Sequence, residues 1–154
     1  MRLWHERLLP HLPRQQLLGQ HRECCALRGN GWGKPHATVN YVFEHPYEWL
    51  WAYHIRVMEE MIRRGYKVNP NWYPMHYRGR TAPSIVYYPK DSPAANSPSW
   101  TQFPEGCYKP APDSAAINRR LIQGSLIYPE HNDQYLKECL DNLARKGIVL
   151  EVTT

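Results

Sequence analysis

The sequence predicts a mainly α fold: a compact single-domain bundle of three to four helices with one long loop rich in proline and aromatic residues. Apolar residues recur at spacings of three and four in several stretches, which is the period of an α-helix. Most of the 14 prolines fall between Pro70 and Pro112, where a long helix is excluded. A length of 154 residues suits one domain, residues 1–154.

Local start and stop signals set the expected helices. The first runs from Arg14 to Leu27, between Pro13 and Gly29. The second covers residues 45–66, has an apolar stripe, and ends at Gly65 after a basic last turn. Two further amphipathic helices are expected at 112–124, with Asp113 or Ser114 as its cap, and at 129–147.

Residues 67–113 are predicted to form an ordered loop that wraps the helices, with a short strand at 84–88. Tyrosines and tryptophans alternate with the prolines throughout this stretch, so it is too aromatic for a free linker. Long ordered loops in compact domains are often functional.

Composition points toward a polyanionic partner. The net charge is +5, the pI is near 9.1, and 8 histidines can add positive charge in mild acid. The 11 Tyr and 6 Trp against 2 Phe suit either base stacking or half-buried packing. Residues 1–16 contain charges and prolines where a secretory signal is apolar, and no run of about 18 apolar residues exists. A cytosolic location is therefore expected.

The 4 cysteines and 8 histidines raise the question of a metal site. The usual zinc spacings, CxxC and HxxxH, are not found, so neither a metal nor another cofactor is expected. Cys24 and Cys25 lie on the leucine-rich side of the first helix, and buried cysteines are usually inert packing residues.

The stretch "LLGQHRECCALRG" (17–29) carries the main candidate for catalysis. His21, Arg22 and Glu23 are adjacent ionisable residues in a helix that otherwise suits a core. Gly19 and Ala26 leave space beside Glu23, although glycine inside a helix costs about 1 kcal/mol relative to alanine. Either a functional carboxylate beside its arginine or a plain solvent-facing pair is consistent with this pattern.

These residues resemble the pyrimidine-dimer DNA glycosylase family of the endonuclease V type. The resemblance lies in "MRLW…LPRQQLLGQHRECCALRG", with Arg2, Leu17, Leu18, Arg22 and Glu23. It continues in "HATVNYVFEHPYEWLWAYHIRVMEEMIRRGYKV" (36–68), which looks like the family's second helix with its basic-basic-Gly-aromatic end at 63–66. A weaker similarity lies in "INRRLIQGSLIYPEH" (117–131). The chain is most similar to a bacterial branch of that family.

The resemblance implies a DNA repair enzyme, a DNA glycosylase with abasic-site lyase activity. The α-amine of Met1 would attack C1′ of the damaged nucleotide, with Glu23 moving protons. An α-amine has a pKa of about 8 against about 10.4 for lysine, so much of it is neutral near pH 7. Expected DNA contacts are Arg2, Arg22, Arg28, Lys34, Arg119 and Arg120.

The resemblance also implies double-stranded DNA, damaged or abasic, as the partner of a monomeric protein in the bacterial cytosol. Gln16 stands where the family has a histidine and His21 lies nearby in the sequence, so both are expected to be auxiliary residues. The bulky Arg2 after Met1 predicts that Met1 is retained. Cyclobutane dimers, other damaged pyrimidines and abasic sites all remain compatible substrates. A non-catalytic nucleic-acid-binding module, or an interaction protein with a surface Arg–Glu pair, are the alternatives.

Overall fold

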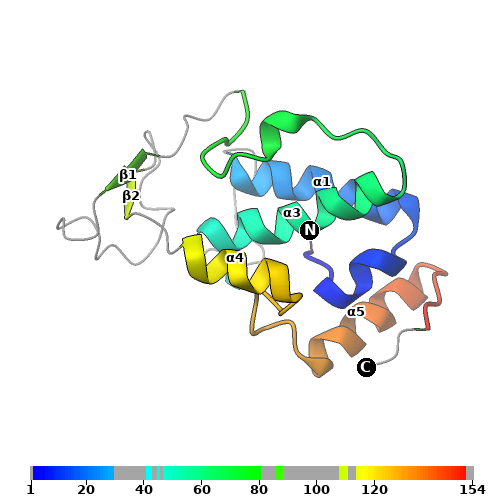
Figure 1. Ribbon diagram of the computed structural model, residues 1–154. Coiled ribbons are helices and arrows are strands. Elements are labelled where there is room, and N and C mark those ends of the chain that lie inside the picture. The colour runs from blue at the N-terminus through cyan, green and yellow to red at the C-terminus, as the bar shows by residue number, and fades with distance from the viewer. Residues whose placement is uncertain are drawn as a thin grey trace.

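Two helices that pack side by side, α1 (Arg14–Arg28) and α3 (Tyr47–Arg63), form the centre of the molecule (Figure 1). The structure is a computed structural model that describes residues 2–29, 41–42, 45, 47–80, 86–88, 108–110 and 114–151. Helix α4 (Ser114–Gln123) and the 3₁₀ helix η1 (Glu6–His11) both contact α3. Helix α5 (Asp133–Arg145) lies beside η1 (Figure 1).

Helix α1 confirms the first predicted helix almost to the residue. It follows Pro13 directly, and the N–H of Gly29 closes its last turn by donating to the carbonyl groups of Cys25 and Ala26. Leu17, Cys24 and Leu27 are completely buried, as the apolar spacing predicts. The apolar side of α1 therefore faces the core and fixes which of its residues remain available to a site.

Helix α3 corresponds to the second predicted helix. It starts two residues later and ends three residues earlier than the predicted 45–66. It ends in a Schellman motif, in which Tyr66 N–H donates to Met61 O and Gly65 N–H donates to Ile62 O. Gly65 adopts φ 84°, a left-handed conformation that favours glycine. The stripe Leu50, His54, Val57, Met58 and Met61 is buried as predicted.

The two later helices confirm the predictions with shorter bounds. Helix α4 ends before Gly124, as expected. Helix α5 starts at Asp133 rather than at 129 because the Asn132 side chain caps it by accepting from Tyr135 N–H. The preceding residues 129–130 form a turn.

Between α3 and α4, the described residues include a 3₁₀ turn, η2 (Pro70–Trp72), and a short parallel pair of strands. Strand β1 (Val86–Tyr88) pairs with β2 (Tyr108–Pro110) and lies inside the predicted 84–88 segment. The strands lie to one side of the helices (Figure 1). Residues 81–85, 89–107 and 111–113 of the predicted 67–113 loop, among them the cap residue Asp113, lie outside the described residues.

The described residues are mainly helical, which confirms the predicted fold class. Among the residues that the structure describes, no helix is long and apolar enough to cross a membrane. The single domain over residues 1–154 stays a prediction.

A buried carboxylate ties the start of the chain to the rest of the fold. Glu6 lies in η1, and its carboxylate accepts from the N–H groups of Ile127 (2.8 Å) and Tyr128 (3.2 Å). It also forms an ion pair with Arg56 of α3. Burial raises the pKa of Glu6, and these donors oppose the rise. Glu6 thus holds η1 against α3 and against residues 127–128.

Candidate active site

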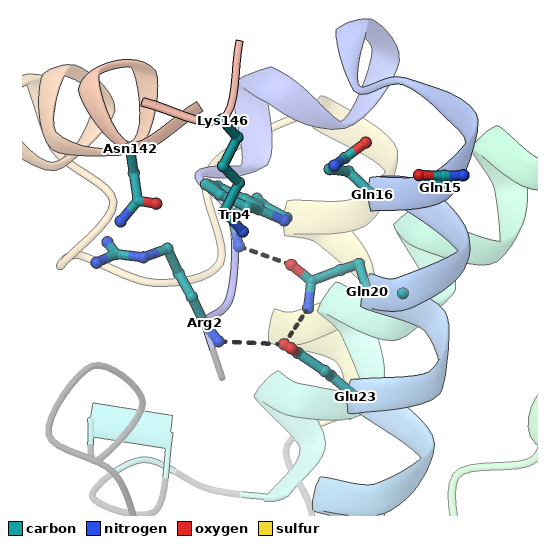
Figure 2. Close-up of a pocket in the computed structure, with 9 residues that line it drawn as sticks. Arg2, Trp4, Gln15, Gln16, Gln20, Glu23, Asn142 and Lys146 are labelled. Carbon is teal, nitrogen blue, oxygen red and sulfur yellow. Dashed lines mark hydrogen bonds between the residues drawn. The ribbon is translucent and has the colours of Figure 1, made fainter. Parts of the chain in front are cut away.

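A pocket of about 420 Å³ lies between α1 and α5, next to the start of the chain. Figure 2 shows α1 contributing one wall and α5 the other, with residues 2–4 running between them. The lining is mostly polar and consists of Arg2, Trp4, Gln15, Gln16, Gly19, Gln20, Glu23, Asn142 and Lys146. It therefore offers carboxamides, two cations and one carboxylate to a ligand.

The first residues of the chain are hydrogen-bonded to α1 in a regular way. The N–H of Arg2 donates to Glu23 Oε2 at 3.2 Å, and the N–H of Trp4 donates to Gln20 Oε1 at 2.6 Å. Alternate N–H groups of an extended segment thus meet side chains three residues apart on one helix face (Figure 2). This pairing fixes the register of the chain start against Glu23.

Glu23 is half-buried at the edge of the pocket. Burial raises the pKa of its carboxyl group above the usual 4.5. The Arg2 N–H, the positive charge of the amino terminus, the Gln20 amide and Lys146 each oppose that rise. A carboxyl group with a raised pKa inside a polar pocket suits proton transfer near neutral pH.

Two cationic side chains border the pocket. The Arg2 guanidinium lies 6.0 Å from the centre of the Tyr135 ring and extends toward Asn142 (Figure 2). The Lys146 ammonium lies 5.5 Å from the centre of the Trp4 ring. Such contacts orient the cations without neutralising them, so both remain available to an anionic ligand.

Several of the predicted site residues meet in this pocket. Arg2, Gln16 and Glu23 line it, together with Gly19. A Cβ added to Gly19 would meet only Arg22 Nη2, at an ordinary 3.8 Å, so the protein itself does not require glycine there. Arg22 is exposed beside the pocket without being part of its lining.

The prediction that Arg28 contacts DNA is wrong. Its side chain is fully buried and donates to five neutral acceptors: Tyr47 Oη, His54 Nδ1 and the carbonyl groups of Trp72, Pro74 and Tyr77. All five N–H donors of the guanidinium are used inside the protein. Arg28 therefore holds the segment after α3 on the end of α1 and presents no surface to a ligand.

His21 lies away from the pocket, in a group with Cys25 and His54 whose ligand atoms are within 4.8 Å of one another. Arg28 donates to His54 Nδ1, so the His54 proton is on Nε2 and points to His21 Nδ1 at 2.9 Å. A metal on His54 Nε2 would force that proton onto Nδ1, against the Arg28 N–H. Burial raises the pKa of the Cys25 thiol to about 11, far from a thiolate. These contacts favour a hydrogen-bonded chain over a metal site.

The other predicted DNA contacts lie elsewhere. Arg119 is exposed on α4, while Arg120 donates to Ile127 O at 3.1 Å and lies 4.8 Å from the centre of the Trp49 ring. Arg120 thus has a structural role in joining α4 to the segment before α5. Met1 and Lys34 lie outside the described residues.

Five lining residues were not predicted from the sequence: Trp4, Gln15, Gln20, Asn142 and Lys146. The sequence could have indicated Gln20, because it precedes Glu23 by three residues and therefore lies on the same face of the helix as Glu23. No sequence pattern indicates Asn142 and Lys146, because they reach the pocket only through the packing of α5 beside the start of the chain. The second wall of the pocket is thus a consequence of tertiary structure.

The fold and the pocket define a small helical protein with a carboxylate-centred site at its amino-terminal segment. Residues 1–74 match the family model described as pyrimidine dimer DNA glycosylase. The predicted resemblance is thereby confirmed over these residues, which include η1, α1, α3 and η2. No curated protein and no solved structure matches the chain. Asn142 and Lys146 fall outside the matched residues.

Proposed function

We propose that the protein is a DNA repair glycosylase with abasic-site lyase activity that works through the α-amine of Met1 and the carboxylate of Glu23. One observation carries this proposal: the first peptide N–H of the chain, that of Arg2, donates to Glu23. The carboxylate is thus linked to the start of the chain at the edge of an open polar pocket.

Covalent geometry limits how far the amine can be from Glu23. Three bonds, about 4.3 Å in total length, separate the α-nitrogen of residue 1 from the nitrogen of Arg2. Added to the 3.2 Å hydrogen bond, this gives at most about 7.5 Å between the amine and Glu23 Oε2 in any conformation of Met1. A sugar carbon about 3 to 3.5 Å from the amine can therefore lie between the two groups.

The proposed reaction forms and breaks bonds in a fixed order. The neutral amine attacks C1′, the C1′–base bond breaks, and the base leaves with the electron pair and gains a proton. The amine loses its proton and the sugar ring opens to give an imine at C1′. Glu23 then takes a proton from C2′, and the C3′–oxygen bond breaks as the 3′ phosphate leaves. Water finally releases the amine.

The charges around the pocket support a DNA substrate. Arg2 and Lys146 offer two cations at the pocket, and Arg22 is exposed next to it. Phosphate contacts of this kind supply affinity and position the strand, while sequence or lesion choice comes from other contacts. The carboxamides of Gln15, Gln16 and Asn142 are the available hydrogen-bonding groups for those other contacts.

Borohydride trapping tests the proposal. Duplex DNA with a single abasic site, and duplex DNA with a cyclobutane dimer, are each incubated with three proteins: the chain itself, a form with extra residues before Met1, and a matched form with the same residues after Thr154. We expect a covalent adduct with the first and third proteins only. An adduct that survives the amino-terminal extension would contradict the α-amine mechanism. DNA binding without an adduct in all three proteins would instead support a non-catalytic binding module.

A further inference from the structure

We propose that Gln20 is a positioning residue that holds the chain start in register and occupies one oxygen of Glu23, leaving the other oxygen, Oε1, to move protons. This inference rests on the proposed function and adds a residue that the sequence did not single out. It assigns different tasks to the two oxygens of one carboxylate.

The Gln20 side chain is held by two hydrogen bonds and one further polar contact at a nearly fully buried position. Its Oε1 accepts from Trp4 N–H at 2.6 Å and lies 3.0 Å from the Tyr53 hydroxyl, and its Nε2 donates to Glu23 Oε2 at 3.2 Å. Only 1% of Gln20 is exposed. A backbone N–H cannot accept, and a carboxylate cannot donate, so the amide has one satisfactory orientation.

Tyr53 anchors this arrangement from the neighbouring helix. Its hydroxyl lies on α3, is completely buried, and donates to Trp4 O at 2.6 Å. Residue 4 is therefore bound through its N–H by Gln20 and through its carbonyl group by Tyr53. Two helices thus fix the extended segment on which Arg2 sits, two residues upstream.

Both described hydrogen bonds to Glu23 end on the same oxygen. Oε2 accepts from Arg2 N–H and from Gln20 Nε2, each at 3.2 Å (Figure 2). Within the part of the chain that the structure describes, Oε1 has no such donor. Oε2 therefore anchors the carboxylate, while Oε1 is the atom available to a proton on the substrate.

Two substitutions separate the two tasks of Gln20. Gln20→Glu keeps an acceptor for Trp4 N–H but replaces the N–H that faces Glu23 with an oxygen, which adds a like charge. Gln20→Met keeps a similar shape and removes both hydrogen bonds. The loss of the donor raises the pKa of Glu23 in both variants, and the added charge raises it further in Gln20→Glu.

The first measurement does not depend on catalysis. The Glu23 carboxyl carbon is followed by NMR during a pH titration of the wild type, Gln20→Glu and Gln20→Met, with Gln134→Met as control because Gln134 is exposed on α5. We expect the Glu23 midpoint to rise in Gln20→Met, to rise further in Gln20→Glu, and to stay unchanged in Gln134→Met. An unchanged midpoint in both Gln20 variants would overturn the inference, whether or not the protein is active.

The second measurement uses single-turnover cleavage of abasic DNA between pH 5 and 8. We expect the acid side of the rate profile to move to higher pH in both Gln20 variants, with a rate loss of about tenfold or more at pH 6 that recovers as the pH rises. Gln20→Met should also lower the plateau, because the chain start is no longer held. A uniform loss at every pH in both variants would show a merely structural role. Absence of any adduct with the wild type would overturn the proposed function instead.

Discussion

Glu23 is half-buried and yet faces an open pocket, a combination that raises its pKa and keeps it accessible. If it moves the C2′ proton, Glu23→Gln should slow cleavage of abasic DNA by about 100-fold or more, which is the range of general base catalysis. Single-turnover kinetics measure this rate, with Glu138→Gln, an exposed position on α5, as the matched control. Normal cleavage by Glu23→Gln would refute the role of this carboxylate.

Lys146 lines the pocket but lies outside the residues that match the family model. Its substitution therefore tests whether this part of the chain contributes to DNA binding. If its ammonium binds a phosphate, Lys146→Ala should weaken DNA binding and reduce the slope of log K against log salt by about 1. Lys137→Ala is the control, since Lys137 is exposed on α5, the helix that Lys146 directly follows, and does not line the pocket. Equal salt slopes for the two variants would contradict a phosphate contact at Lys146.

At the scale of elements, Arg28 joins the end of α1 to the segment that follows η2. A lysine cannot replace Arg28. The three N–H donors of lysine sit on one nitrogen and cannot reach all the acceptors that surround the planar guanidinium of Arg28. We expect Arg28→Lys to lower the free energy of unfolding by about 3 kcal/mol, the cost of losing buried hydrogen bonds to a charged group. Urea denaturation measures it, with Arg145→Lys at an exposed helix end as control. Equal stability of the two variants would contradict this role.

The elements also show what the sequence could and could not predict. Helix α1 was predicted well because its signals, Pro13, Gly29 and the leucine spacing, are local. Arg28 was assigned to DNA binding because no sequence pattern predicts its partners. Three of its acceptors are carbonyl groups of residues 72–77, more than forty positions away along the chain. The wall of the pocket formed by α5 was missed for the same reason.

At the scale of the whole molecule, buried histidines link stability to pH. Burial lowers the pKa of His131 to about 3 and holds that of His54 well below its usual 6.5. Below pH 6.5 these two histidines bind protons in the unfolded chain but stay neutral in the folded chain. The free energy of unfolding therefore falls as the pH falls. We expect the free energy of unfolding to drop by about 2 kcal/mol for His131 between pH 6.5 and 5, at about 1.36 kcal/mol per pH unit, and the neutral His54 adds to the loss in the same direction.

Urea denaturation at pH 7 and at pH 5 checks this expectation in a range where most carboxyl groups stay ionised. The control is His76→Asn, which removes an exposed histidine and should leave the difference between the two pH values unchanged. A wild-type protein that is equally stable at pH 7 and pH 5 would show that His54 and His131 are not held in their neutral form.

The identity of the trapped nitrogen decides whether the chain's own α-amine forms the imine. Lys146 lines the same pocket and is the rival amine there. The adduct with abasic DNA is reduced with borohydride, digested with nuclease and protease, and mapped by mass spectrometry. We predict that the sugar remnant is on the α-nitrogen of Met1. A remnant on the side chain of Lys146, or on any other lysine, would show that a lysine amine and not the α-amine forms the imine.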